Sequence, residues 1–107
     1  MGYRDVVLRY FDMWNSGDTT GIDDIIDPDW IDHAHPEVRG PGGVRDSIAA
    51  IKAAQPRLHF HLDHMLDDTD MIAVAGSVHG ATTRLMWLIR IRDGRMAEMW
   101  TYRGADA

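Results

Sequence analysis

The hydrophobic period of this 107-residue chain changes at about residue 57. Upstream of that point, most apolar residues recur at the spacing of amphipathic helices, whereas downstream they alternate with polar residues as half-buried strands do. Short turn sequences separate the downstream strands, so we expect them to pair antiparallel as a meander. Helices and sheet can then bury their apolar sides only against each other, which predicts an α+β fold.

The expected elements follow the order ααβαββββ and fill the chain, so residues 1–107 are expected to form one domain. Helices are expected at residues 3–15, 19–27 and 43–54, a short strand at 29–36, and later strands at 57–66, 71–80, 83–94 and 95–103. Gly17 suits the left-handed cap that ends the first helix, and Pro28 prevents the second helix from continuing. Gly94 supplies the positive φ that the last hairpin turn requires.

Composition argues against several classes of function. The net charge of −6 argues against nucleic acids and anionic membranes as partners, because both are bound by basic surfaces. The absence of cysteine excludes disulfides and thiolate chemistry. No apolar run approaches the ~20 residues that span a membrane, and the start of the chain has no leader pattern. A cytoplasmic location is therefore expected.

Two pairs of histidines raise the question of a metal. Within each pair the residues are two apart, so on a strand both imidazoles share one face: His33 with His35, and His59 with His61. Ile31 is in phase with the first pair, which predicts that this face is buried, whereas the second pair alternates with apolar residues and should face outward. Zinc or iron needs three or four converging ligands at ~2 Å. Because the two pairs cannot meet, no metal site is expected.

Four segments together resemble the SnoaL-like polyketide cyclases of the nuclear transport factor 2-like superfamily, which also includes ketosteroid isomerase. They are "YFDMWNSGD", "DWIDHAHP", the glycine loop "RGPGG" with the helix after it, and "RDGRMAEMW". The resemblance covers roughly residues 5–103. It implies a cone, in which a bent antiparallel sheet wraps three helices and leaves a deep pocket beside the first helix. The outer face of such a sheet commonly forms a dimer.

The resemblance also implies catalytic positions. Aligned on "NSGD", Tyr10 falls where the isomerase has the tyrosine that donates to an oxyanion. If Pro36 matches the proline after the isomerase's base, His35 takes the position of the base, with His33 on the same face. Asp32 is expected on the opposite face and is the weaker candidate. The alternative is structural: Tyr10 as a core aromatic, and the two histidines as satisfied polar residues at a strand end.

Residues expected to contact a substrate come from the first helix and the last two strands. They are Phe11, Trp14, Trp87, Met99, Thr101 and Arg103. Two departures from the family pattern stand out. Trp87 occupies the place of the isomerase's protonated aspartate, and the late aspartate of the polyketide cyclases has no equivalent except Asp106 near the end of the chain. Any acid or base role therefore shifts to His33 and His35.

The leading hypothesis is a cofactor-free cyclase or isomerase that acts on a hydrophobic, polyketide-like carbonyl compound. In it a histidine removes an α-proton, Tyr10 stabilises the enolate oxygen and aromatic walls hold the rings. Two alternatives stay open: a small-ligand-binding domain without chemistry, and a hydrolase or dehydratase that uses the same pocket. A homodimer is expected through the outer sheet face, which carries His59, His61 and Trp100.

Overall fold

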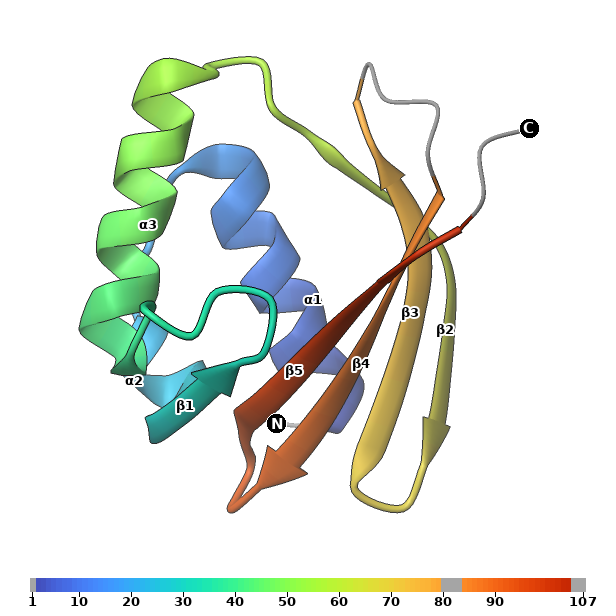
Figure 1. Ribbon diagram of the computed structural model, residues 1–107. Helices are drawn as coiled ribbons and strands as arrows, with labels where there is room; N and C mark the ends of the chain where they lie inside the picture. Colours follow the sequence, from blue (N-terminus) through green and yellow to red (C-terminus); the bar gives the residue numbers. More distant parts are fainter. Residues whose placement is uncertain (1, 80–83, 105–107) are drawn as a thin grey trace.

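The computed structural model describes residues 2–79 and 84–104, and its elements confirm the predicted order ααβαββββ (Figure 1). They are α1 (Tyr3–Ser16), α2 (Ile22–Ile25), β1 (Ile26–Asp32), α3 (Gly40–Ala54), β2 (Phe60–Asp68), β3 (Met71–Val78), β4 (Arg84–Arg92) and β5 (Arg95–Arg103). In the described ranges, no helix has both the length and the apolar character needed to cross a membrane.

The five strands form one curved, unclosed sheet in the order β1-β5-β4-β3-β2 (Figure 1). Strands β2 to β5 make the predicted antiparallel meander. The sheet as a whole is mixed, because β1 runs parallel to β5 at one edge. A parallel pair needs a long connection between its strands, and α3 with the three strands after it provides that connection.

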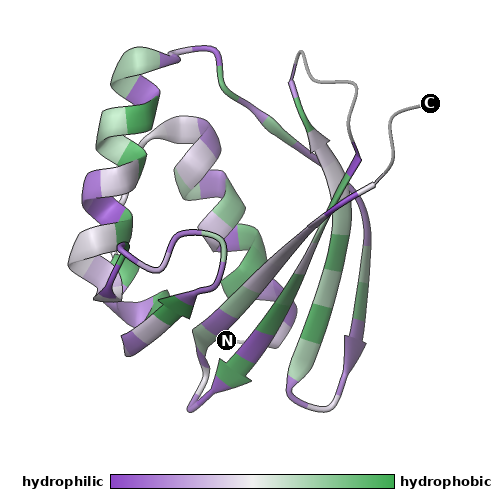
Figure 2. Ribbon diagram, viewed as in Figure 1, coloured by the Kyte–Doolittle hydropathy of each residue, from purple (hydrophilic) through white to green (hydrophobic). Residues whose placement is uncertain are grey.

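The hydrophobic core lies between the helices and the concave face of the sheet. Figure 2 shows apolar residues on α1 and along β3, and the buried residues of both elements belong to one hydrophobic cluster. The fully buried side chains from helix and sheet include Val6, Val7, Phe11, Ile48, Ile72, Val74, Ile89 and Met96. Their spacing is helical in α1 and strictly alternate in β3 and β4, so the period change in the sequence marks the two layers of this core.

Strand β1 starts and ends earlier than predicted, and its inward face is the opposite one. It ends at Asp32, so His33 and His35 lie after the strand and not on it. Trp30 and Asp32 are buried at 3% and 7% exposure, whereas Ile31 is 48% exposed. The prediction that Ile31 marks the buried face is therefore wrong. Trp30 has more apolar surface than Ile31, and only one of two adjacent strand residues can face the core.

An ion pair anchors the start of β1. The Arg92 guanidinium donates to the two carboxylate oxygens of Asp27 at 3.1 and 3.4 Å, and the backbone N–H of Asp29 donates to the same carboxylate at 2.8 Å. Burial alone would raise the pKa of Asp27, but the hydrogen bonds from Arg92 and Asp29 hold it below its usual value. This buried acid is therefore ionised and paired at neutral pH.

Strand β2 contains a bulge that brings two backbones unusually close. The pairing of β2 with β3 shifts register between Leu62 and His64, and Gly76 lies opposite this shift. A Cβ atom at Gly76 would overlap the backbone carbonyl oxygen of His61. The close approach therefore requires glycine, which is a common reason for glycine inside a strand.

Candidate active site

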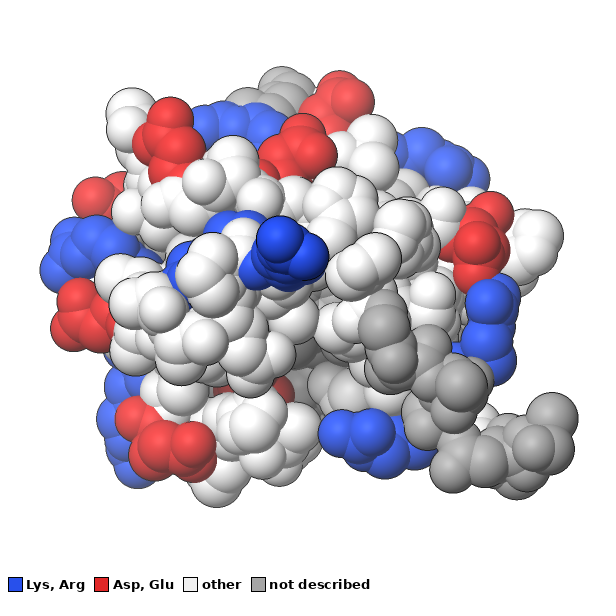
Figure 3. Space-filling model, turned by 90° about the horizontal axis from the view of Figure 1, so that it is seen from above, with Lys and Arg blue, Asp and Glu red and all other residues white. Residues whose placement is uncertain are grey.

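A pocket of about 840 Å³ lies between the helices and the concave side of the sheet, with walls from α1, β1, α3 and the later strands. Seen from above, uncharged atoms cover much of the molecule, most charged side chains lie toward the edge of this face, and a basic side chain projects near its centre (Figure 3). Such a volume is typical of sites for small organic ligands.

Aromatic side chains form the rigid inner wall of this pocket. The ring centroids of Phe11 and Trp87 are 5.0 Å apart, and those of Phe60 and Trp87 are 5.6 Å apart, both in edge-to-face arrangements. Trp14 packs in the same way on Phe60 at 5.8 Å. Interlocked rings of this kind hold an apolar wall in place, which suits a ligand that itself carries rings.

Tyr10 projects from α1 onto the pocket wall and is only 5% exposed. Burial raises the pKa of Tyr10 well above its ordinary value; the nearby Trp14 side chain lowers the pKa and the negative charge of Asp32 raises it, but burial is the largest of the three effects. The phenol therefore stays protonated. A protonated phenol can donate a hydrogen bond to a ligand in the pocket.

Asp32, at the end of β1, is the buried carboxylate of the pocket. One of its oxygens accepts a hydrogen bond from the backbone N–H of Ala34 at 3.0 Å. It lies close enough to Tyr10 for its charge to affect the pKa of the phenol. The sequence analysis placed Asp32 on the other face. Trp30 lies two residues earlier on the same strand, so its side chain shares a face with that of Asp32. The expected burial of this large apolar residue could have predicted the correct face.

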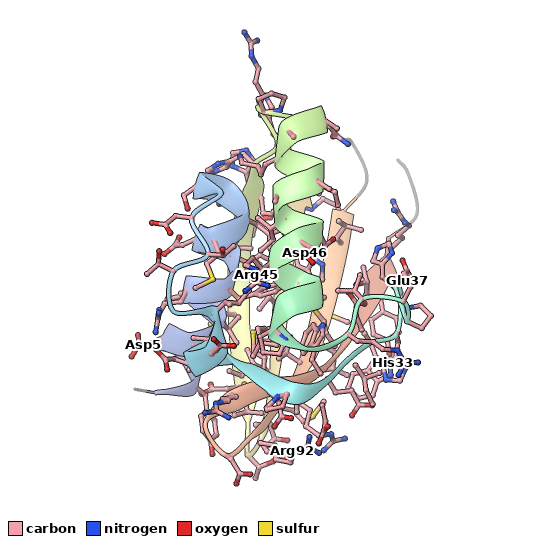
Figure 4. The ribbon with its side chains drawn as sticks, turned by 90° about the vertical axis from the view of Figure 1, so that its left-hand side faces the viewer. Asp5, His33, Glu37, Arg45, Asp46 and Arg92 are labelled. Atoms are coloured by element: carbon pink, nitrogen blue, oxygen red, sulfur yellow. The ribbon has the colours of Figure 1, made fainter. Side chains whose placement is uncertain are left out.

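His33 lies outside the pocket, so its predicted orientation is wrong. Its ring stacks on Trp100 with centroids 4.7 Å apart and planes 7° apart, and its Nε2 atom lies 2.7 Å from a carboxylate oxygen of Glu98. Figure 4 shows His33 at the edge of the molecule, on the side away from α1. The structure therefore does not bring His33 together with Tyr10, because β1 ends at Asp32 and His33 follows in a turn.

His35 is at the pocket mouth. It lines the pocket, but its side chain is 66% exposed and its Nδ1 atom lies 3.6 Å from a carboxylate oxygen of Glu37. The six residues predicted to contact a substrate also lie on the pocket wall: Phe11, Trp14, Trp87, Met99, Thr101 and Arg103. Their contact with a substrate, and the catalytic roles of His35 and Tyr10, stay predictions.

Trp30 is a pocket residue that the sequence analysis missed. It lines the pocket beside Tyr10, with the two ring centroids 6.1 Å apart. Among the described residues, its indole nitrogen is the one buried side-chain nitrogen or oxygen without a hydrogen-bond partner. A large apolar residue in the same strand as the histidines is visible in the sequence, but its free N–H becomes apparent only in the folded chain.

The second histidine pair faces outward, as predicted. His59 and His61 are exposed, with ring centroids 4.8 Å apart. Within residues 2–79 and 84–104, no group of three histidine, aspartate or glutamate side chains is arranged to hold a metal ion.

A curved sheet that holds an apolar pocket against three helices defines a class of small α+β domains. Within this class, the chain belongs to the SnoaL-like domain family, whose model matches residues 7–99. The resemblance predicted from the sequence is thereby confirmed. Among curated protein sequences, none matches the chain significantly.

Several solved structures share the fold. A SnoaL-like polyketide cyclase from Agrobacterium tumefaciens is 15% identical, with a TM-score of 0.80 over 97% of this chain and 92% of that one. IdmH, a proposed polyketide cyclase from Streptomyces antibioticus, is 19% identical, with a TM-score of 0.79 over 96% and 92%. An NTF2-like protein of unknown function from Cytophaga hutchinsonii is 11% identical, with a TM-score of 0.78 over 97% and 91%. At these identities the likeness establishes the fold alone.

Proposed function

We propose that this chain is a cofactor-free acid/base catalyst, a cyclase or isomerase that acts on a hydrophobic, ring-containing carbonyl compound. One observation carries the proposal: a buried carboxylate, Asp32, and a buried phenol, Tyr10, both line one apolar, aromatic-walled pocket. A base and a hydrogen-bond donor are the two groups that enolisation of a ketone needs. The polyketide cyclase names of two structural neighbours agree with this chemistry.

In the proposed reaction, the Asp32 carboxylate removes a proton from the carbon next to the substrate's carbonyl group. The negative charge moves from Asp32 to the substrate oxygen, where the Tyr10 hydroxyl donates to it. Asp32 is then neutral and can return the proton to a different carbon, which is isomerisation. Alternatively, the enolate attacks a second carbonyl group of the same molecule, which closes a ring. The aromatic wall would favour this attack by holding both groups in place.

His35 and Arg103 have supporting roles in this proposal. Both lie on the pocket lining and both are exposed, so they sit where a ligand enters. A neutral imidazole can exchange protons with water at physiological pH, which suits His35 to carrying protons between solvent and the pocket. Arg103 suits an oxygen substituent at the outer end of the ligand.

The proposal predicts that the protein accelerates exchange of carbon-bound protons in a simple enolisable ketone. The probe is 2-tetralone, a bicyclic ketone small enough for a pocket of about 840 Å³. Deuterium uptake from D₂O, followed by mass spectrometry, should be faster with the protein than in buffer at the same pH. Binding seen as tryptophan fluorescence quenching without any added exchange would instead support the ligand-binding alternative and contradict catalysis.

We also propose a homodimer through the outer sheet face. Met86 pairs with Tyr102, and Leu88 with Trp100, across the two strands β4 and β5, so apolar side chains are grouped on this face. Met86 and Tyr102 are 42% and 48% exposed. Light scattering at micromolar concentration should give the mass of a dimer, and Met86→Glu should reduce it to that of a monomer. A monomeric mass for the unaltered chain would contradict the dimer.

A further inference from the structure

Arg103 is the one arginine or lysine among the described residues that line the pocket. Its side chain is exposed, and it forms no hydrogen bond or ion pair with another described residue. Other arginines of the sheet do have such partners: Arg90 pairs with Glu98, and Arg92 pairs with Asp27. A guanidinium that lines a pocket without an acid of its own is available to an anionic group of a ligand.

The register of the sheet gives the place of Arg103 along the pocket. Alternate residues of β5 lead from the core to the mouth: Met99 is buried, Thr101 is half-buried and Arg103 is exposed, and all three line the pocket. Asp32 on β1 is the register partner of Met99, and both side chains are buried. Because a strand rises ~3.3 Å per residue, the backbone of Arg103 lies roughly 13 Å further along β5 than the position beside Asp32. The pocket therefore has an acidic inner end and a basic outer end.

The other charged groups of the lining indicate which anion Arg103 suits. Glu37 is exposed at the mouth, with a carboxylate oxygen 3.6 Å from Nδ1 of His35, and Asp32 lies further in. Without Arg103 this lining would repel anions. One guanidinium beside two acidic residues of the same lining suits a group with a single negative charge better than a doubly charged phosphate. A carboxylate has that charge, and its planar shape allows two parallel hydrogen bonds with a guanidinium.

We propose that the substrate is a keto acid, held with its carbonyl group at the inner end of the pocket and its carboxylate on Arg103. This inference rests on the proposed function and specifies the class of its substrate. The Arg103 side chain covers part of the distance between the two ends, and a frame of two fused rings covers the rest. Holding the ligand at its outer end would orient the carbon next to the carbonyl group toward Asp32.

Three derivatives of 2-tetralone test this orientation. The first has a carboxylate at C6, across the ring system from the ketone, the second has an uncharged carboxamide at C6, and the third has a carboxylate at C8, near the ketone. Their affinities can be measured by quenching of the tryptophans in the pocket wall, at about pH 8, where histidine is ordinarily neutral. The 6-carboxylate should bind about 3- to 10-fold more tightly than the 6-carboxamide, the range for a charge-assisted contact that solvent can reach. High ionic strength should reduce this preference.

Variants at position 103 assign the preference to the guanidinium. In Arg103→Gln the 6-carboxylate should bind more weakly than the 6-carboxamide, because the acidic residues that remain in the lining are Asp32 and Glu37. Arg103→Lys keeps the positive charge and should keep the preference for the carboxylate. Arg95→Gln makes the same change at the other end of β5, outside the pocket lining, and should leave the ratio of the two affinities as it is. Circular dichroism verifies that each variant is folded.

The outcomes separate this inference from the proposed function. Equal affinities for the 6-carboxylate and the 6-carboxamide, or an unaltered ratio in Arg103→Gln, would overturn the keto-acid assignment even if proton exchange is catalysed. An 8-carboxylate that binds as tightly as the 6-carboxylate would overturn the orientation. A preference that depends on Arg103, without exchange of carbon-bound protons, would uphold the carboxylate site and overturn catalysis. If none of the three ketones binds, both proposals fail.

Discussion

Replacing Asp32 with Asn should slow deuterium exchange into 2-tetralone by at least about 10²-fold, the usual scale for loss of a general base. The change keeps the shape of the side chain, so its oxygen can still accept from the backbone N–H of Ala34, 3.0 Å away in the structure. The amide cannot take up a proton as the carboxylate does. Among the described residues that line the pocket, Asp32 is the one buried carboxylate. Exchange rates with saturating ketone, measured by mass spectrometry, give the comparison.

Two matched variants control for this prediction. Asp29→Asn makes the same chemical change on the same strand at an exposed position, and His33→Gln removes the imidazole that lies outside the pocket. Both should exchange within about 3-fold of the unaltered protein, well short of the effect of losing a base. Full activity in Asp32→Asn together with a large loss in His33→Gln would show that the base has been misassigned. Circular dichroism and retained binding of 2-tetralone should verify that each variant is folded.

Replacing Gly76 with Ala should lower the free energy of unfolding by about 2–4 kcal/mol, which places it among the more damaging single substitutions. The new methyl group would overlap the carbonyl oxygen of His61, which belongs to the backbone and cannot rotate away. Strand β2 would have to separate from β3 at the bulge to make room. For a domain of this size the midpoint of thermal unfolding should fall by about 10–20 °C, measured by circular dichroism.

Gly42→Ala is the matched control for this effect. Gly42 lies in the first turn of α3, where a Cβ would meet only the end of the flexible Arg45 side chain, at 3.4 Å. Alanine should leave stability unchanged or raise it by up to about 1 kcal/mol, because it restricts the unfolded chain. If both variants unfold at the same temperature, the close backbone approach at Gly76 does not control the stability of the sheet.

Most of the architecture could be predicted because its signals are local. The alternation of Ile72 and Val74, or of Trp87 and Ile89, reports directly which side of a strand is buried, and the structure agrees. Gly17 and Gly94 have the positive φ values that a helix cap and a hairpin turn require. The parallel pairing of β1 with β5 could not be derived in this way. It depends on the position at which the chain returns to β1 after α3 and three further strands.

The candidate site was predicted only in part. The six wall residues and Tyr10 come from elements whose inward faces are clear from their periodicity, and all of them line the pocket. The catalytic assignment failed at β1, a strand of seven residues in which Trp30 and Ile31 compete for the same face. A difference of one residue in phase moved Asp32 into the pocket and His33 out of it.

The order of helices and strands, the inward faces of the long elements and the family follow from the amino-acid pattern, because each depends on residues near one another in the chain. The orientation of β1, the meeting of a carboxylate and a phenol in one pocket lining, and the unpaired indole N–H of Trp30 exist only in the folded protein. These features depend on whether the core has room for the side chain of Trp30 or for that of Ile31. That room is set by side chains from α1, α3 and β5, which no local stretch of sequence contains.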